Sequence, residues 1–154
     1  MLPKEAVARI NAALKKYPDS SSALLPALYI AQSHAGHLPL HVLDTVSRLL
    51  DLPEAHVRGV ASFHVMFRDK PVGRHLIQLC TNVACMTAAT TALLDALQER
   101  LGLAPGSTTL DNRYTLIEAE CIGECEKSPA MLVDHDVHTR LTVESLLEIL
   151  EEYE

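Results

Sequence analysis

Residues 75–85, HLIQLCTNVAC, and residues 114–125, YTLIEAECIGEC, each join a short apolar run to a pair of cysteines. Both runs have the length and composition of buried β-strands. A helical pattern lies between them, and a strand-helix-strand unit predicts parallel pairing with a right-handed crossover. We therefore expect both cysteine pairs at the carboxyl ends of adjacent parallel strands, at one edge of a sheet. The chain of 154 residues has only these cysteines: Cys80, Cys85, Cys121 and Cys125.

Four thiolates at one sheet edge form a cage suited to iron-sulfur or zinc. The spacings are C-x4-C and C-x3-C, whereas structural zinc usually takes its pairs as C-x2-C. A 2Fe-2S rhomb takes two thiolates on each iron, and the wider loops favour it. Zinc and structural or redox-active cysteines remain alternatives. A disulfide framework is disfavoured because no secretory signal is expected, and a thiol oxidoreductase would require C-x-x-C at a helix start.

The two cysteine loops contain further candidate residues. We expect Cys85 just before a helix, where the N-terminal dipole and free N–H groups stabilise a thiolate or a cluster anion. Thr81 and Asn82 are candidate hydrogen-bond donors to cluster sulfur, and Gly123 permits a turn that other residues avoid. Ordinary turn chemistry explains Thr81, Asn82 and Gly123 equally well.

The remainder of this half predicts a small α/β domain. Helical spacing over 86–101 ends at Gly102, residues 130–141 predict a hairpin around His135-Asp136, and Thr142 is expected to cap a terminal helix. The order β-α-β-β-α is that of a minimal thioredoxin-like domain, which we assign to residues 71–154. The buried side of the 86–101 helix is expected to carry Leu93, Leu94, Leu97 and Leu101.

Residues 1–70 predict four amphipathic helices. Ser22 is expected to cap the second helix, Gly36 to end it, and Pro53 to occupy the first turn of the fourth. The predicted fold class is thus α+β, a four-helix unit followed by a thioredoxin-like α/β domain. The aromatic end of the fourth helix is expected in the core through Phe63, Met66 and Phe67.

Composition excludes several classes of function. With 48% hydrophobic residues, 21% charged residues and a net charge of -7, the chain suits an ordinary cytosolic protein and disfavours nucleic acid and anionic lipid as partners. No apolar stretch reaches the ~20 residues that a membrane span needs. Residues 38–63 have the length of a helix-turn-helix, but its second helix offers only Arg58 and Arg68 as cations. We interpret His34, His37 and His41 as surface or capping histidines.

Three stretches of the chain carry a family resemblance. Residues 59–86 (GVASFHVMFRDKPVGRHLIQLCTNVACM), 118–138 (EAECIGECEKSPAMLVDHDVH) and 24–63 resemble the thioredoxin-like 2Fe-2S protein, the E-type component, of bacterial NADH-quinone oxidoreductase, respiratory complex I. The resemblance implies one low-potential 2Fe-2S cluster beside a flavin. It implies these ligands: Cys80, Cys85, Cys121 and Cys125.

The same resemblance implies partners and a location. The partner would be the flavoprotein subunit that binds FMN and NADH, with further peripheral-arm subunits, on the cytoplasmic side of the inner membrane and without direct membrane insertion. The chain would be a subunit of an oxidoreductase without a complete catalytic site, because its six glycines are scattered and form no phosphate loop. The equivalent subunit of an NAD-linked hydrogenase or formate dehydrogenase is the nearest alternative.

Acidic residues crowd the second cysteine pair, with only Lys127 as a nearby cation. Negative charge disfavours the reduced state of a cluster, so it lowers the reduction potential. Our hypothesis is that Glu124, where the family commonly has alanine, contributes to a low potential. The alternative is a solvated acidic loop whose charges are screened. The acidic residues are Glu118, Glu120, Glu124 and Glu126.

Overall fold

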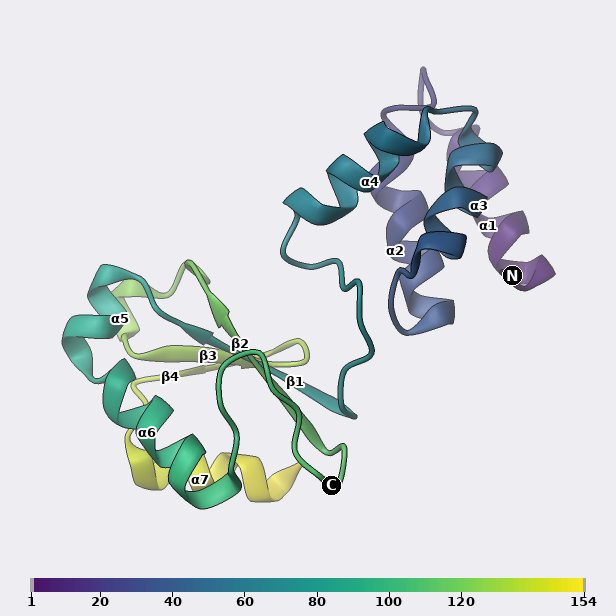
Figure 1. Ribbon diagram of the computed structural model, residues 1–154. Helices are drawn as coiled ribbons and strands as arrows, with labels where there is room; N and C mark the ends of the chain where they lie inside the picture. The colour runs from purple at the N-terminus through teal and green to yellow at the C-terminus, as the bar shows by residue number, and fades with distance from the viewer. Residues whose placement is uncertain (1, 154) are drawn as a thin grey trace. The chain divides into compact units, whose positions relative to one another are not determined.

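The computed structural model describes residues 2–153. The chain divides into two compact units, one ending at Pro71 and one beginning at Val72. The first unit is all helical and the second contains a sheet with helices (Figure 1). Each unit has its own buried apolar cluster, which is what permits it to be described by itself.

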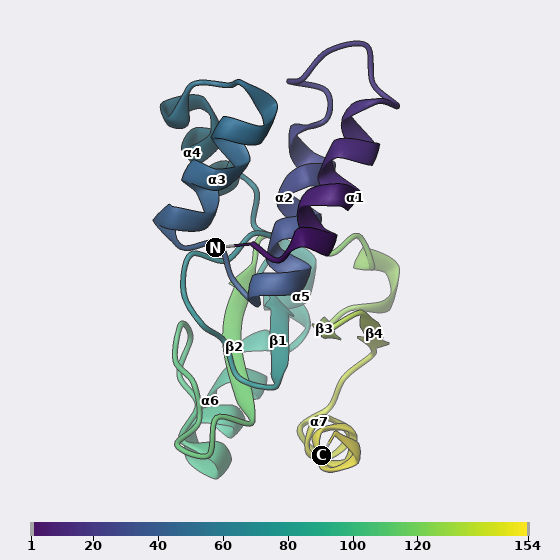
Figure 2. The ribbon, with the colours of Figure 1, turned by 90° about the vertical axis from the view of Figure 1, so that its right-hand side faces the viewer.

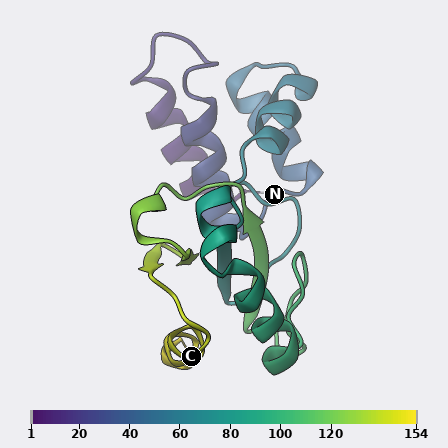
Figure 3. The ribbon, with the colours of Figure 1, turned by 90° about the vertical axis from the view of Figure 1, so that its left-hand side faces the viewer.

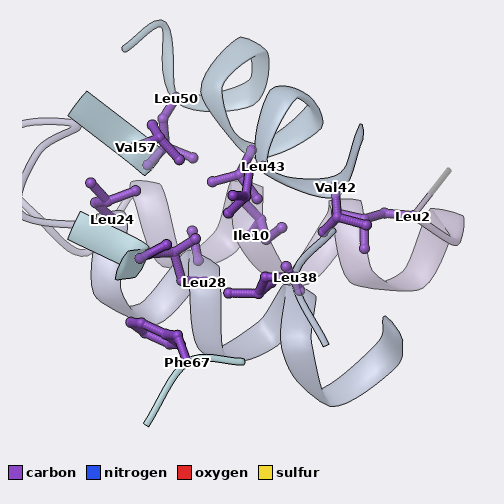
Figure 4. Packing of buried hydrophobic residues seen from close by; sticks show 14 of the residues in the cluster. Leu2, Ile10, Leu24, Leu28, Leu38, Val42, Leu43, Leu50, Val57 and Phe67 are labelled. Atoms are coloured by element: carbon purple, nitrogen blue, oxygen red, sulfur yellow. The ribbon is translucent and has the colours of Figure 1, made fainter. Parts of the chain in front are cut away.

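Four helices build the first unit around one apolar core. Each helix contributes a fully buried side chain: Ile10, Leu28, Val46 and Val57. Figure 4 shows side chains of this cluster packed between the helices. Burial of these apolar faces, which the helical spacing predicted, is the main source of stability for such a unit. The helices are α1 (Lys4–Leu14), α2 (Leu24–Ala35), α3 (Leu40–Leu50) and α4 (Glu54–Phe63).

The helix ends confirm one expectation and correct two. Gly36 ends α2 with a positive φ of 77°, which glycine adopts without steric cost. The prediction that Ser22 caps α2 was wrong, since Ala23 is the N-cap and Ser22 instead bonds to Asp19 through its backbone N–H at 2.8 Å. Pro53 lies at the N-cap of α4, one residue before the first turn expected for it.

The aromatic segment at the end of α4 departs from the expected core. Phe67 is buried, as predicted, and its ring packs edge-on against that of Tyr29, with the two ring centroids 5.1 Å apart. Phe63 and Met66 were expected in the core, and that prediction was wrong because both are exposed. Apolar residues continue in the sequence past the end of α4. Their pattern identifies hydrophobic residues but does not predict which of them the other helices bury.

The second unit contains a four-stranded mixed sheet in the order β2-β1-β3-β4 (Figure 2). Strand β1 pairs with β2 in parallel, as predicted, and with β3 antiparallel, and β3 and β4 form the hairpin. The hairpin turn falls at Asp134-His135, one residue earlier than expected, because Asp136 already pairs with Val133. The strands are β1 (His75–Cys80), β2 (Tyr114–Ala119), β3 (Ala130–Val133) and β4 (Asp136–Thr139).

Helices α6 (Thr90–Leu101) and α7 (Val143–Glu152) pack with the sheet in one apolar cluster. Alternate strand residues such as Ile77, Leu79 and Leu116 share that cluster with both helices. Figure 3 shows α6 in front of the strands. The leucines predicted for the buried side of the helix are confirmed, with Leu93 and Leu97 fully buried and the other two partly so.

The single helix predicted over 86–101 is in fact two helices. Helix α5 (Val83–Ala88) starts earlier than expected, because the Asn82 side chain accepts a hydrogen bond from Val83 N at 2.9 Å. The helix breaks at Ala89, and α6 then begins with the buried Thr90. The break brings the Thr90 hydroxyl to the Cys80 carbonyl, to which it donates at 3.0 Å.

Helix α7 depends on the capping box predicted at Thr142. The Thr142 hydroxyl accepts from Ser145 N at 3.2 Å, and the Ser145 hydroxyl accepts from Thr142 N at 2.9 Å. Thr142→Ala should therefore lower the free energy of unfolding by about 1 kcal/mol, measured by urea unfolding. The control is Thr91→Ala, an exposed threonine in the first turn of α6, which should leave it unchanged. Equal effects of the two substitutions would contradict the capping role.

Candidate metal centre

Parallel pairing brings the two cysteine loops to the same edge of the sheet. Cys80 is the last residue of β1 and lies level with Ala119, the last residue of β2. The next residue extends the pairing, because Thr81 N donates to the Ala119 carbonyl at 2.9 Å. Cys121 follows two residues after the end of β2. The two loops therefore leave their strands side by side, which is the arrangement predicted from the sequence.

The first loop places one cysteine on a strand and one on a helix. Cys80 ends β1, and Cys85 lies within α5, not before the helix as expected. Both side chains are buried. Burial acts to raise the pKa of the Cys80 thiol and the backbone of Asn82 acts to lower it, which is consistent with the donor role expected of Asn82. Thr81 does not take that role, because its N–H and its hydroxyl both donate to the Ala119 carbonyl.

The second loop is more open. Cys121 and Cys125 are exposed, and Cys125 begins a single 3-10 turn, η1 (Cys125–Lys127). Gly123 has a φ of 89° and donates its N–H to the Cys121 sulfur at 3.4 Å. This position thus requires a positive φ, as the sequence predicted, and that conformation directs the Gly123 N–H at the Cys121 sulfur.

The thiols of the two loops lie near one another. Cys85 of the same loop and Cys121 of the other loop both act on the ionisation of the Cys80 thiol, and Cys121 acts on that of Cys125. Ala130 and Ile122 pack against the buried pair. The two cysteine loops therefore begin at one edge of the sheet, with thiols of both loops near one another.

These surroundings act on the ionisation of the thiols. Burial tends to raise the pKa of the Cys80 thiol, but hydrogen bonds from the backbone of Asn82 and Ile122 and from its neighbouring thiols outweigh burial and lower it. Burial raises the pKa of Cys85, and the adjacent Cys80 adds to that rise. The Cys80 thiolate is thus the one that the protein stabilises first.

The charges of the second loop are partly compensated. Lys127 Nζ lies 3.2 Å from Glu124 Oε2, so the carboxylate singled out from the sequence has a cationic partner. The other three acidic residues of the loop are exposed. Their fields act through solvent, which screens them. Glu124 and Lys127 together, more than Glu124 alone, set the charge beside the exposed cysteines.

All four cysteines are free thiols. Among residues 2–153, no three histidine, cysteine or acidic side chains already surround one point as ligands of a single ion. Cys80 and Cys121 are the cysteines through which the two loops come near one another. His34, one of the histidines noted above, lies 3.4 Å from Arg9 Nη1 at the end of α2. No helix within the described part of the chain has the length and hydrophobicity to cross a bilayer.

The sequence did not predict two residues that contact the buried cysteine pair. Thr90 is fully buried and donates to the Cys80 carbonyl, and Ala130 packs against the buried pair. The signal available for Thr90 was a polar residue at the start of an apolar helical stretch. Ala130 had no comparable signal, because its contacts arise from pairing of β3 with β1.

Three comparisons place the chain among known proteins. The model of a family described as thioredoxin-like [2Fe-2S] ferredoxin matches residues 10–154. An E-type subunit of NADH-quinone oxidoreductase from Rhizobium meliloti (strain 1021), the second of that type by its name, is 43% identical over 94% of this chain and 86% of its own length. The E-type subunit of NADH-quinone oxidoreductase from Escherichia coli (strain K12) is 38% identical over 89% of this chain and 82% of its own.

A solved structure is also similar. It is an NAD+-reducing [NiFe]-hydrogenase in the air-oxidized state, with a TM-score of 0.72 and 28% sequence identity over 84% of this chain. The match covers only 22% of the hydrogenase chain, so this chain spans about a fifth of that protein's length.

The buried hydrogen bond from Thr90 to Cys80 generates a prediction about this edge of the sheet. Thr90→Val keeps the size of the side chain but leaves the Cys80 carbonyl without this donor, so the free energy of unfolding should fall by about 1–3 kcal/mol in urea titrations. The control Thr90→Ser retains the hydroxyl, so its free energy of unfolding should fall by less than that of Thr90→Val. If valine proves as stable as serine at this position, the hydrogen bond does not hold this edge.

Proposed function

Because the chain belongs to the thioredoxin-like [2Fe-2S] ferredoxin family, we propose that it is the electron-carrying E-type subunit of an NADH-quinone oxidoreductase. The family implies one [2Fe-2S] cluster. The observation that carries the proposal for its site is the meeting of two cysteine loops at one edge of a parallel strand pair. The proposed ligands are Cys80, Cys85, Cys121 and Cys125.

The donor set fits such a cluster. Two irons require two thiolates each, and each loop supplies two. Backbone N–H groups are also directed at sulfur, including those of Asn82 at Cys80 and Gly123 at Cys121. Hydrogen bonds of this kind stabilise negative charge on sulfur and tune the potential of an iron-sulfur centre. The residues therefore provide both the ligands and some of the hydrogen-bond donors to the ligand sulfurs.

When bound, the cluster supplies one-electron chemistry. The chain itself shields one half of the site from solvent and leaves the other half exposed. Cys80 and Cys85 are buried, whereas Cys121 and Cys125 are exposed. A redox partner can therefore approach most closely over the second loop. We assign this task to residues 71–154 and regard the helices of residues 1–70 as a separate unit.

The partner that fits this role is the flavoprotein subunit that binds FMN and NADH, with further subunits of the peripheral arm. The assembly would lie on the cytoplasmic side of the inner membrane, without membrane insertion by this chain. The equivalent subunit of an NAD-linked hydrogenase is the second candidate, supported by the similar hydrogenase structure. The first is favoured because its named relatives are more similar and match this chain over most of their own length.

Metal analysis tests the proposed ligands directly. The purified wild-type chain should contain two irons and two acid-labile sulfides, and Cys85→Ala or Cys121→Ala should lose most of both. Met86→Ala is the matched control, since Met86 is an exposed neighbour of Cys85 on α5 and should keep the full content. Stoichiometric zinc in place of iron, or full iron in either cysteine variant, would contradict the proposed site.

The Glu124 and Lys127 pair predicts opposite shifts in the midpoint potential. Glu124→Gln removes a negative charge and should raise the potential, while Lys127→Gln removes its counter-charge and should lower it, each on the order of 10 mV. Redox titration at low ionic strength measures both. Glu151→Gln is the control, because Glu151 lines a cavity with Tyr114, which lies at the other end of β2. Shifts of the same sign in the two variants would rule out the charge mechanism.

A further inference from the structure

Arg140 adopts a backbone conformation that an arginine rarely takes. It directly follows β4 and has a φ of 53°, in the left-handed region. In residues 2–153 the other non-glycine residues with a positive φ are aspartate or asparagine, whose short side chains tolerate it: Asp51, Asn112 and Asp134. A conformation of this kind costs free energy and persists only where the surrounding structure enforces it. That cost must be offset by what Arg140 contributes.

The backbone of Arg140 holds the second cysteine loop. Arg140 N donates to the Lys127 carbonyl at 2.8 Å, and Lys127 ends the 3-10 turn that Cys125 begins. The next residue continues this contact, because Leu141 N donates to the Pro129 carbonyl at 3.2 Å. Leu141 is itself buried in the apolar cluster of the second unit. Two hydrogen bonds thus connect the turn that carries Cys125 to the core of the unit.

This backbone contact alone does not account for an arginine. Glycine would offer the same N–H and would adopt a positive φ without steric cost. What glycine lacks is the charged side chain. Arg140 is exposed, and within the described residues 2–153 it forms no ion pair. The positive charge is therefore the contribution that the backbone contact leaves unexplained.

The acidic residues closest to Arg140 in the sequence have other partners. Asp136 accepts a hydrogen bond from the Tyr153 hydroxyl at 3.0 Å. The pKa of Glu144 is lowered by its own backbone N–H at the start of α7 and by the Thr142 side chain, so its carboxylate interacts with the end of that helix. Neither carboxylate neutralises the guanidinium of Arg140.

Arg140 is a second cation beside the exposed cysteine pair. The sequence indicated only Lys127, and Glu124 compensates its charge at 3.2 Å. Because a 3-10 turn rises only about 2 Å per residue, the hydrogen bond to Lys127 places the Arg140 backbone within roughly 10 Å of that of Cys125. This distance is close to the screening length of about 10 Å at 0.1 M ionic strength. The charge of Arg140 therefore acts on the cysteine site with incomplete screening.

We propose that Arg140 is a positioning residue for the second cysteine loop and that its charge raises the midpoint potential of the [2Fe-2S] cluster. Its N–H holds the turn that contains Cys125. Its guanidinium stabilises the additional negative charge of the reduced state, which the acidic residues of the loop disfavour. The inference rests on the proposed function, which supplies the cluster.

Redox titration of charge variants tests the proposal. Arg140→Gln should lower the midpoint potential at low ionic strength, and the shift should shrink as salt is added. Arg140→Lys keeps the charge and should keep the wild-type potential. Arg74→Gln is the matched control, since Arg74 is an exposed arginine directly before β1, whose far end carries Cys80. An unchanged potential in Arg140→Gln, or an equal shift in both glutamine variants, overturns the proposal.

Arg140→Gly separates the charge from the backbone. Glycine keeps the N–H that donates to Lys127 and relieves the strained φ, so this variant should be at least as stable in urea as Arg140→Gln. Its midpoint potential should nevertheless fall as far as that of Arg140→Gln. A wild-type potential in Arg140→Gly would contradict the role of the charge, and lower stability than the glutamine variant would contradict the strained conformation.

Iron and sulfide measured on the same samples separate this inference from the proposed function. Full cluster content with a wild-type potential in Arg140→Gln overturns the inference and leaves the proposed function intact. A wild-type chain without iron and sulfide contradicts the proposed function and, with it, the inference.

Discussion

Parallel pairing of β1 with β2 is the constraint on which the rest of the second unit depends. Six residue pairs, from His75 with Tyr114 to Cys80 with Ala119, hold the strands in register. Since the strands run in the same direction, the loops that follow them begin at one edge of the sheet. Helices α5 and α6 and the loop that follows them separate the cysteine pairs in sequence and also permit the crossover. A slip of register would move one loop away from the other.

The site combines protection with access. On the β1 side, Thr90 donates to the Cys80 carbonyl and Ala130 packs against the buried thiols, so this half is shielded from solvent. On the β2 side, Gly123 shapes an open loop whose cysteines are exposed. Metal-bound thiolates gain from backbone donors on both sides. Because the proposed ligands come from two loops that the folded sheet brings to one edge, cluster binding at this site would be thermodynamically linked to folding of this unit.

Much of this arrangement could be predicted from the sequence, because strand length, helical spacing and cysteine spacing are local signals. The parallel strand pair, the Thr142 cap and the glycine ends at Gly36 and Gly102 followed from such signals and are confirmed. The break at Ala89 could not be predicted, since it accompanies a tertiary hydrogen bond of the next residue, to a carbonyl ten residues away in the chain. The exposure of Phe63 also could not be predicted, because the spacing of apolar residues does not show which of them other elements bury.

The central claim is that thiolates from both loops bind one di-iron centre, and iron K-edge X-ray absorption tests it most directly. The purified chain should show iron with a first shell of sulfur alone and a second iron as the nearest metal neighbour. Nitrogen or oxygen in the first shell would mean that a cysteine of one loop is not a ligand. Iron without an iron neighbour would contradict the account as a whole.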